Sequence, residues 1–164
     1  MTVYTTIDSP LGELLLTGEP VSDGVMLTAL SIEGGKSVAV QSDWAADPAA
    51  FDAVAAQLRE YFDGKRTGFD LEFGGAGSDF QRRVWQELEQ IPYGATVTYG
   101  EIASRIGASR AAVRAVGAAI GANPLLIVRP CHRVVGADGA LTGYAGGVDR
   151  KRRLLELERT RVAA

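Results

Sequence analysis

The sequence has 164 residues, 46% of them hydrophobic and 23% charged, with a formal net charge of −3. This composition fits one folded domain or two small lobes and excludes a disordered chain. The only cysteine, Cys131, excludes an internal disulfide, and with a single histidine, His132, it excludes a zinc site of four such ligands. No apolar stretch is long enough to span a bilayer, and no secretory signal is recognised. We therefore expect a cytoplasmic protein without a metal or other cofactor.

Strand patterns dominate the first part of the chain. Residues 3–8 and 13–17 are predicted strands, and the turn residues 9–12 between them predict a hairpin. Residues 25–32 are a third apolar run of strand length, and residues 67–73 are a candidate for one more. We expect these segments to form a sheet with antiparallel strands.

One helix and a linker complete this half. Asp47 followed by Pro48 predicts a helix start, and apolar residues recur at helical spacing until Gly64. Residues 74–77 are Gly, Gly, Ala and Gly, which is typical of a linker. We therefore place a boundary near residue 76, between lobes 1–76 and 77–164.

The charge changes sign at the same boundary. Residues 1–78 carry 4 Lys and Arg against 12 Asp and Glu, whereas residues 79–164 carry 13 against 8. A basic half is compatible with a polyanionic partner, although two halves of a chain can also differ by chance.

The second lobe has helical patterns throughout. Residues 78–81 and 98–101 each have the form of a capping box, and the first of these helices should end before Pro92. Gly107 ends the second helix, and Ser109 can cap a third that runs to about residue 121. Two short helices joined by a glycine-containing turn suggest a helix-turn-helix.

Two later segments also have recognisable patterns. Residues 125–128 predict a short buried strand or extended run. Asp149 can cap a final helix, and we expect the basic run 150–153 on it to be a solvated face.

The third predicted helix is almost without bulk, because alanine and glycine surround Arg114. Small side chains allow close approach to another surface. That surface could be a neighbouring helix, or it could be the narrow minor groove of DNA, where an arginine could enter the base stack.

The most informative segment is the one around Cys131. The adjacent His132 is by itself a weak signal, because consecutive side chains of an extended chain point apart. The surrounding residues, however, closely resemble the active-site region of the O6-alkylguanine-DNA alkyltransferases. The resemblance is carried by Asn123 and Pro124 and by residues 130–136 and 141–147. It extends upstream through residues 80–81, 84–85, 91–94, 99–103 and 114–117, and downstream through residues 150–151 and 154–158.

The resemblance implies a mechanism. Cys131 would be the acceptor of an alkyl group, His132 the base that acts on it through a bound water, and Glu158 the acid that orients His132. Asn123 would brace the active-site turn. Tyr99 would help to rotate the target nucleotide and would give a proton to the departing guanine.

The resemblance also implies a partner and a fold. The partner is double-stranded DNA containing O6-alkylguanine, bound through the minor groove by a monomer. The fold is α/β (α+β), with a ribonuclease-H-like first lobe and a mostly helical second lobe carrying the helix-turn-helix. Arg114 would fill the gap left by the flipped base, and the other expected DNA contacts are Ser109, Ala115 and Ala119. The expected substrate pocket consists of Val134, Tyr144, Ala145 and Ile120.

Three features depart from the family pattern. Residues 107–114 are one residue longer than the pattern and lack a proline often found there. Arg129 stands where an aliphatic residue usually precedes the proline, and we expect it to point to solvent rather than to a phosphate. Ala145 stands where some members have serine, which should change substrate tolerance rather than abolish activity.

Three other classes of function are alternatives. A damage-binding module of the same fold lacks the cysteine that is present here. A helix-turn-helix transcription factor generally reads the major groove with a polar helix, which the alanine-rich face fits poorly. A cysteine hydrolase would turn over, whereas a thioether on Cys131 has no easy chemical return, so one molecule should repair one lesion.

Overall fold

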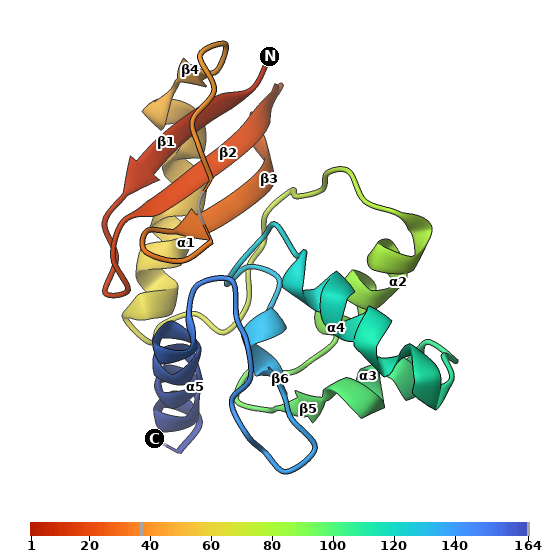
Figure 1. Cartoon of the computed structure of the whole chain (residues 1–164). Coiled ribbons are helices and arrows are strands. Elements are labelled where there is room, and N and C mark those ends of the chain that lie inside the picture. The colour runs from red at the N-terminus through yellow and green to blue at the C-terminus, as the bar shows by residue number, and fades with distance from the viewer. Residues whose placement is uncertain (37, 164) are drawn as a thin grey trace.

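The N-terminal part of the chain is a sheet with a helix packed along it (Figure 1). The computed structural model describes residues 1–36 and 38–163, with side chains as far as residue 160. The sheet has the strand order β3-β2-β1-β4, in which β1, β2 and β3 are antiparallel neighbours and β4 runs parallel to β1. The strands are β1 (Val3–Ile7), β2 (Leu14–Val21), β3 (Gly24–Ile32) and β4 (Ala45–Ala46).

Helix α1 (Asp52–Phe62) follows the predicted start signal. The side chain of Asp47 accepts a hydrogen bond from the backbone of Ala50, and Pro48 opens a 3-10 turn that leads into the helix. Gly64, with φ of 75°, lies just beyond the helix end, where a left-handed conformation favours glycine. The predicted start and end of this helix are thus confirmed.

The predicted strand over residues 67–73 is wrong. Among the described residues, this segment contributes only an isolated bridge between Phe73 and Leu27. Backbone bonds join Leu27 to Glu72 and Gly74, and the chain then leaves the edge of the sheet toward α2. A β-favouring composition could not show that the pairing stops after one residue.

The C-terminal part is mostly helical. Ser78 and Thr98 each close a capping box with the residue three positions on, as predicted. A short parallel pair of strands, β5 and β6, joins two distant segments. The elements are α2 (Asp79–Leu88), β5 (Val97–Thr98), α3 (Tyr99–Arg105), α4 (Val113–Gly121), β6 (Val134–Val135) and α5 (Val148–Ala163).

Two predicted helix starts differ in detail. A 3-10 turn, Arg110–Ala112, occupies the turn stretch, so α4 begins only at Val113 and Ser109 makes no side-chain cap. Asp149 lies in the first turn of α5 rather than ahead of it. An acidic residue is also tolerated within the first turn, because its negative charge interacts favourably with the positive N-terminal end of the helix dipole.

Residues 125–128 form a turn rather than a strand. Leu125 makes an isolated bridge with Leu30, and Ile127 has a φ of 70°. A β-branched residue rarely adopts this left-handed conformation, so the surrounding contacts must impose it.

The expected solvent exposure of Arg129 is wrong, and that of the basic run 150–153 is wrong in part, because only Arg152 and Arg153 are exposed. Arg129 is buried, with only 7% of its surface exposed, and Lys151 in the basic run is buried as well. Arg150 is half-buried and donates to the backbone oxygen of Leu11, so this part of α5 faces the hairpin of the first lobe. Charged side chains are buried where they find partners, which local sequence does not reveal.

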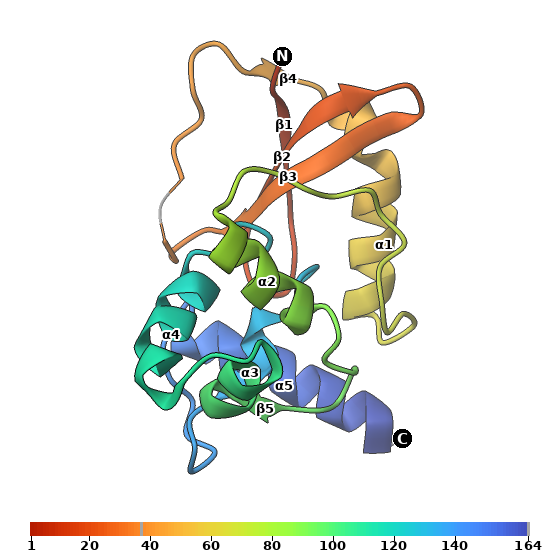
Figure 2. The ribbon, with the colours of Figure 1, turned by 90° about the vertical axis from the view of Figure 1, so that its right-hand side faces the viewer.

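One contiguous hydrophobic core contains residues of both parts of the chain. α5 lies near the C-terminal end of α1 in both views (Figures 1 and 2), which brings residues of the two parts together. Within the described residues, no helix combines the length and the apolar character needed to cross a membrane.

Candidate active site

Cys131 opens a 3-10 turn, Cys131–Arg133, directly before β6. The amide of Asn123 holds the preceding chain: its nitrogen donates to the backbone oxygens of Leu125 and Arg129, and its oxygen accepts from the Leu125 N–H. The backbone N–H of Cys131 donates to the Arg129 oxygen at 2.7 Å. Asn123 therefore lies where a residue that braces this turn must lie.

His132 is fully buried, and its Nε2 lies 2.7 Å from Oε2 of Glu158 on α5. Hydrogen bonds from His132 and Arg133 outweigh burial and lower the pKa of Glu158 to about 2, so the carboxylate only accepts. Nε2 must then carry the proton, which leaves Nδ1 as the free basic nitrogen. Burial lowers the pKa of His132, so the imidazole is neutral and able to take a proton.

Glu158 has two further partners that sequence reasoning missed. The Tyr61 hydroxyl of α1 donates to Oε2 at 2.5 Å, and Arg133 donates from Nε to Oε1 at 2.8 Å and from Nη2 to Oε2 at 3.0 Å. Burial, followed by the Glu158 charge, raises the pKa of Tyr61, so this tyrosine remains a donor. The buried carboxylate is thus fully paired, as a buried charge requires.

The sulfur itself is held in its weakly reactive form. Burial raises the pKa of Cys131 to about 11, against the opposing influence of Asn123, Lys151 and Arg129. At neutral pH the thiol is therefore protonated, and a thiolate can form only when a base removes the proton. A neutral His132 beside it has the properties of such a base.

A cavity of about 780 Å³ opens in front of Cys131. Four predicted site residues line it together with the cysteine: Tyr99, Ile120, Tyr144 and Ala145. Val134 is fully buried behind the turn and is not one of the lining residues. The Tyr99 hydroxyl lies on the cavity wall, 2.7 Å from the hydroxyl of Thr142.

Helix α4 has two distinct faces. Arg114 and Ala115 are exposed, as is Ser109 ahead of the helix. Ala119 instead faces the core, and its backbone oxygen accepts a hydrogen bond from the Trp85 indole at 2.8 Å. The side chain of Ala119 is therefore not placed for a DNA contact, whereas the other three are accessible.

Cations also surround the cavity. Lys36 and Arg110 line its wall, and Lys151 lies over the Tyr99 ring with its nitrogen 5.9 Å from the ring centroid. None of the three was a predicted site residue. The basic character of residues 79–164 was the only indication of Arg110 and Lys151. Lys36 lies in the acidic half, where the charge gave no such indication.

Comparison with known proteins agrees with this geometry. Residues 2–74 match the family model for the 6-O-methylguanine DNA methyltransferase ribonuclease-like domain, and residues 79–160 match that for the DNA binding domain of the same family. The methylated-DNA–protein-cysteine methyltransferase of Mycobacterium bovis is 52% identical over 98% of this chain and 94% of its own length. That of Methanosarcina barkeri is 47% identical over 94% of this chain and 96% of its own.

A solved structure is equally similar. The crystal structure of Mycobacterium tuberculosis OGT in complex with DNA aligns with a TM-score of 0.87 and 51% identity, over 97% of this chain and 94% of that one. The α/β fold expected from the sequence is confirmed. A near full-length match at this identity shows that the chain belongs to the 6-O-methylguanine DNA methyltransferase family.

Proposed function

We propose that this protein repairs DNA by moving an alkyl group from O6 of guanine to its own Cys131. A bond forms between sulfur and the alkyl carbon, the bond from that carbon to O6 breaks, and guanine is left intact. The observation that carries the proposal is the position of Cys131. It lies at the wall of an open cavity and is followed in the chain by the buried His132, which pairs with the buried Glu158.

The protons are accounted for by two residues. The Cys131 proton passes, through one water, to Nδ1 of His132, and Glu158 stabilises the resulting imidazolium. Tyr99 on the cavity wall gives a proton to the departing guanine, which leaves more easily as a neutral molecule. Asn123 keeps the cysteine turn in place.

The partner is double-stranded DNA, bound through the minor groove by the exposed face of α4. The base must leave the stack, because a sulfur inside a cavity cannot reach O6 in a duplex. Arg114, exposed among small residues, is placed to fill the gap, with Ser109 and Ala115 beside it. The flipped guanine then enters the cavity walled by Ile120, Tyr144 and Ala145.

Stoichiometry and organisation follow from the sequence. The product is a thioether, and the 164-residue chain has no second cysteine to accept the group, so each molecule acts once. We assign the alkyl-acceptor and DNA-binding functions to residues 77–164 and a supporting role to residues 1–76. The protein acts as a cytoplasmic monomer.

Intact-mass spectrometry tests the proposal. The protein is incubated with a duplex oligonucleotide that contains one O6-methylguanine. We expect the mass to increase by one CH₂ group, on the Cys131 peptide, saturating at one group per molecule. An unchanged mass with tightly bound lesion DNA would instead identify a damage-binding protein.

A further inference from the structure

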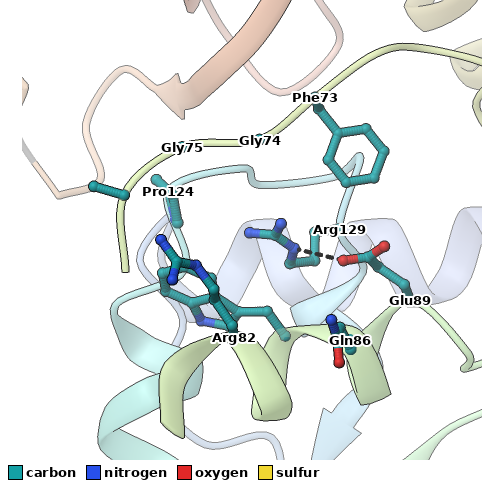
Figure 3. A pocket seen from close by; sticks show the side chains of 10 residues that line it. Phe73, Gly74, Gly75, Arg82, Gln86, Glu89, Pro124 and Arg129 are labelled. Atoms are coloured by element: carbon teal, nitrogen blue, oxygen red, sulfur yellow. Dashed lines mark hydrogen bonds and ion pairs between the residues drawn. The ribbon is translucent and has the colours of Figure 1, made fainter. Parts of the chain in front are cut away.

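Arg129 lies in a part of the molecule away from the alkyl-acceptor cavity. Its guanidinium Nε donates to Oε2 of Glu89, the C-cap residue of α2, at 3.2 Å. The guanidinium carbon lies 4.9 Å from the centroid of the Trp85 ring and 5.5 Å from that of Phe73. Figure 3 shows Arg129 and Glu89 joined by this ion pair, with Phe73 above them, and all three residues line a cavity of about 230 Å³.

The same guanidinium also contacts Asn123, the residue whose side chain holds the segment that leads into the Cys131 turn. Nη1 donates to Oδ1 of Asn123 at 3.2 Å, and Nδ2 of Asn123 donates back to the Arg129 backbone oxygen at 3.2 Å. Both the side chain and the backbone of Arg129 therefore bind Asn123, and the backbone oxygen of Arg129 is also hydrogen-bonded to the N–H of Cys131.

This turn needs such support. Ile127 is the one non-glycine residue with a positive φ among the described residues. A strained conformation of a β-branched residue persists only where several contacts fix the flanking chain. Arg129 supplies several of these contacts: its side chain and its backbone oxygen bind Asn123, and its backbone N–H donates to the Leu125 oxygen at 3.0 Å.

The charge of Arg129 also acts on the sulfur. The charged groups that influence Cys131 are Lys151 of α5 and Arg129, and burial, followed by Cys131 itself, raises the pKa of the Tyr144 hydroxyl. Burial raises the pKa of Cys131, while the Asn123 side chain, which Arg129 binds, and the charges of Lys151 and Arg129 lower it. Glu89 in turn partly neutralises Arg129, so this carboxylate at the C-cap of α2 weakens the effect of Arg129 on the sulfur.

We propose that Arg129 is a positioning residue of the alkyl-acceptor site, which ties the cysteine turn to α2 and supplies a positive charge that favours the thiolate. The role deepens the proposed function and rests on it. It is specific to chains in which arginine, rather than an aliphatic residue, precedes the proline.

The test is the pH dependence of Cys131 alkylation by iodoacetamide, measured on the full-length protein. The reagent is small and needs neither DNA nor a lesion. For Arg129→Met we expect the apparent thiol pKa to rise by about half a unit to one unit, so the rate at neutral pH falls about three- to tenfold. For Glu89→Gln we expect the opposite shift, because Arg129 is then no longer neutralised.

The opposite directions of the two pKa shifts distinguish an electrostatic role from structural support alone. If the ion pair only supported the turn, its loss would change the thiol pKa in the same direction whether Arg129 or Glu89 is replaced. Arg129→Lys keeps the charge and should leave the thiol pKa within a few tenths of a unit. The matched control is Arg82→Met, which removes an exposed arginine of the same cavity and should change nothing. Two results would overturn the proposal. One is a pH profile of Arg129→Met that superimposes on that of the parent protein, and the other is a shift of the thiol pKa in the same direction in Arg129→Met and Glu89→Gln.

Two further measurements keep the test decisive. If Arg129→Met does not fold, Arg129→Met combined with Glu89→Gln removes both charges and leaves neither unpaired. Its thiol pKa should stay above that of the parent, because Arg129 is the group that lowers the pKa of Cys131 and Glu89 acts only through its ion pair with Arg129. Methyl transfer from lesion DNA is measured in parallel: failure of the parent protein there contradicts the proposed function, whereas the iodoacetamide profiles judge Arg129 independently.

Discussion

The two sides of Cys131 differ in almost every physical property. Behind it lies a sealed polar network, in which Glu158 accepts hydrogen bonds from Tyr61, His132 and Arg133. In front lies an open cavity whose wall carries Tyr99, Tyr144 and small residues. In the proposed function, the first side controls the protons and the second admits the substrate.

This difference has a testable consequence. Damage to the network should affect reaction with any substrate, because the thiol must lose its proton in every case. Damage to the DNA-facing surface should affect only duplex DNA, because a free base needs no flipping. Substitutions on the two sides should therefore separate cleanly when both kinds of substrate are compared.

The largest effect is expected for Cys131→Ser, which removes the atom that both sides serve. Transfer should disappear entirely, because a serine hydroxyl is far harder to deprotonate, while lesion DNA should still bind. Mass spectrometry and a binding titration check the two halves of this prediction. Any methyl transfer that persists in the variant would sink the assignment.

Glu158→Gln tests the network. Without the carboxylate the imidazolium loses its counter-charge, and we expect transfer to slow by about 100-fold, the lower range for loss of general-base function. The loss should be equal for duplex DNA and for free O6-benzylguanine. A loss confined to the duplex would show that the two sides of Cys131 are not separate.

The same carboxylate predicts a pH dependence of stability. Its pKa falls from 4.5 to about 2 on folding, so its contribution is fully present above about pH 4.5 and is lost as the pH falls toward 2. Urea unfolding at a series of acidic pH values should show this loss in the parent protein. Glu158→Gln should lack that component, and an identical pH dependence in both proteins would contradict the pairing of Glu158.

Arg114→Ala tests the front. We expect repair of duplex DNA to fall about tenfold, because the gap left by an extruded base is no longer filled. Reaction with free O6-benzylguanine should change less than about twofold, since Arg114 is exposed and is not among the cavity-lining residues. Single-turnover rates on both substrates decide the point, and equal losses would remove the assigned role.

The smallest effect is expected for Ala145→Ser on the cavity wall. The backbone around Tyr144 and Ala145 is unchanged by this substitution, so the methyl-transfer rate should stay within about threefold. The ratio of rates for methyl and benzyl groups should shift, because the wall gains a hydroxyl. A rate change of more than about tenfold with methyl would show that this side chain itself takes part in the reaction.

Local signals in the sequence were reliable where the physics is local. The capping boxes at Ser78 and Thr98 form as predicted, and so does the Asp47 cap of the 3-10 turn that leads into α1, since each depends on residues three positions apart. Predictions failed where a distant partner decides. Residues 67–73 have strand composition but no neighbour to pair with beyond one bridge.

The sequence by itself determined the fold class and the nucleophile, because hydrophobic periodicity is local and the motif around the single Cys131 is specific. Only the tertiary structure decided what surrounds that sulfur. Tyr61 meets Glu158 across 97 positions of chain, and Arg129 is buried because Glu89, Trp85 and Asn123 converge on it. A buried polar group must find partners, and which partners it finds depends on how distant elements pack rather than on its neighbours in sequence.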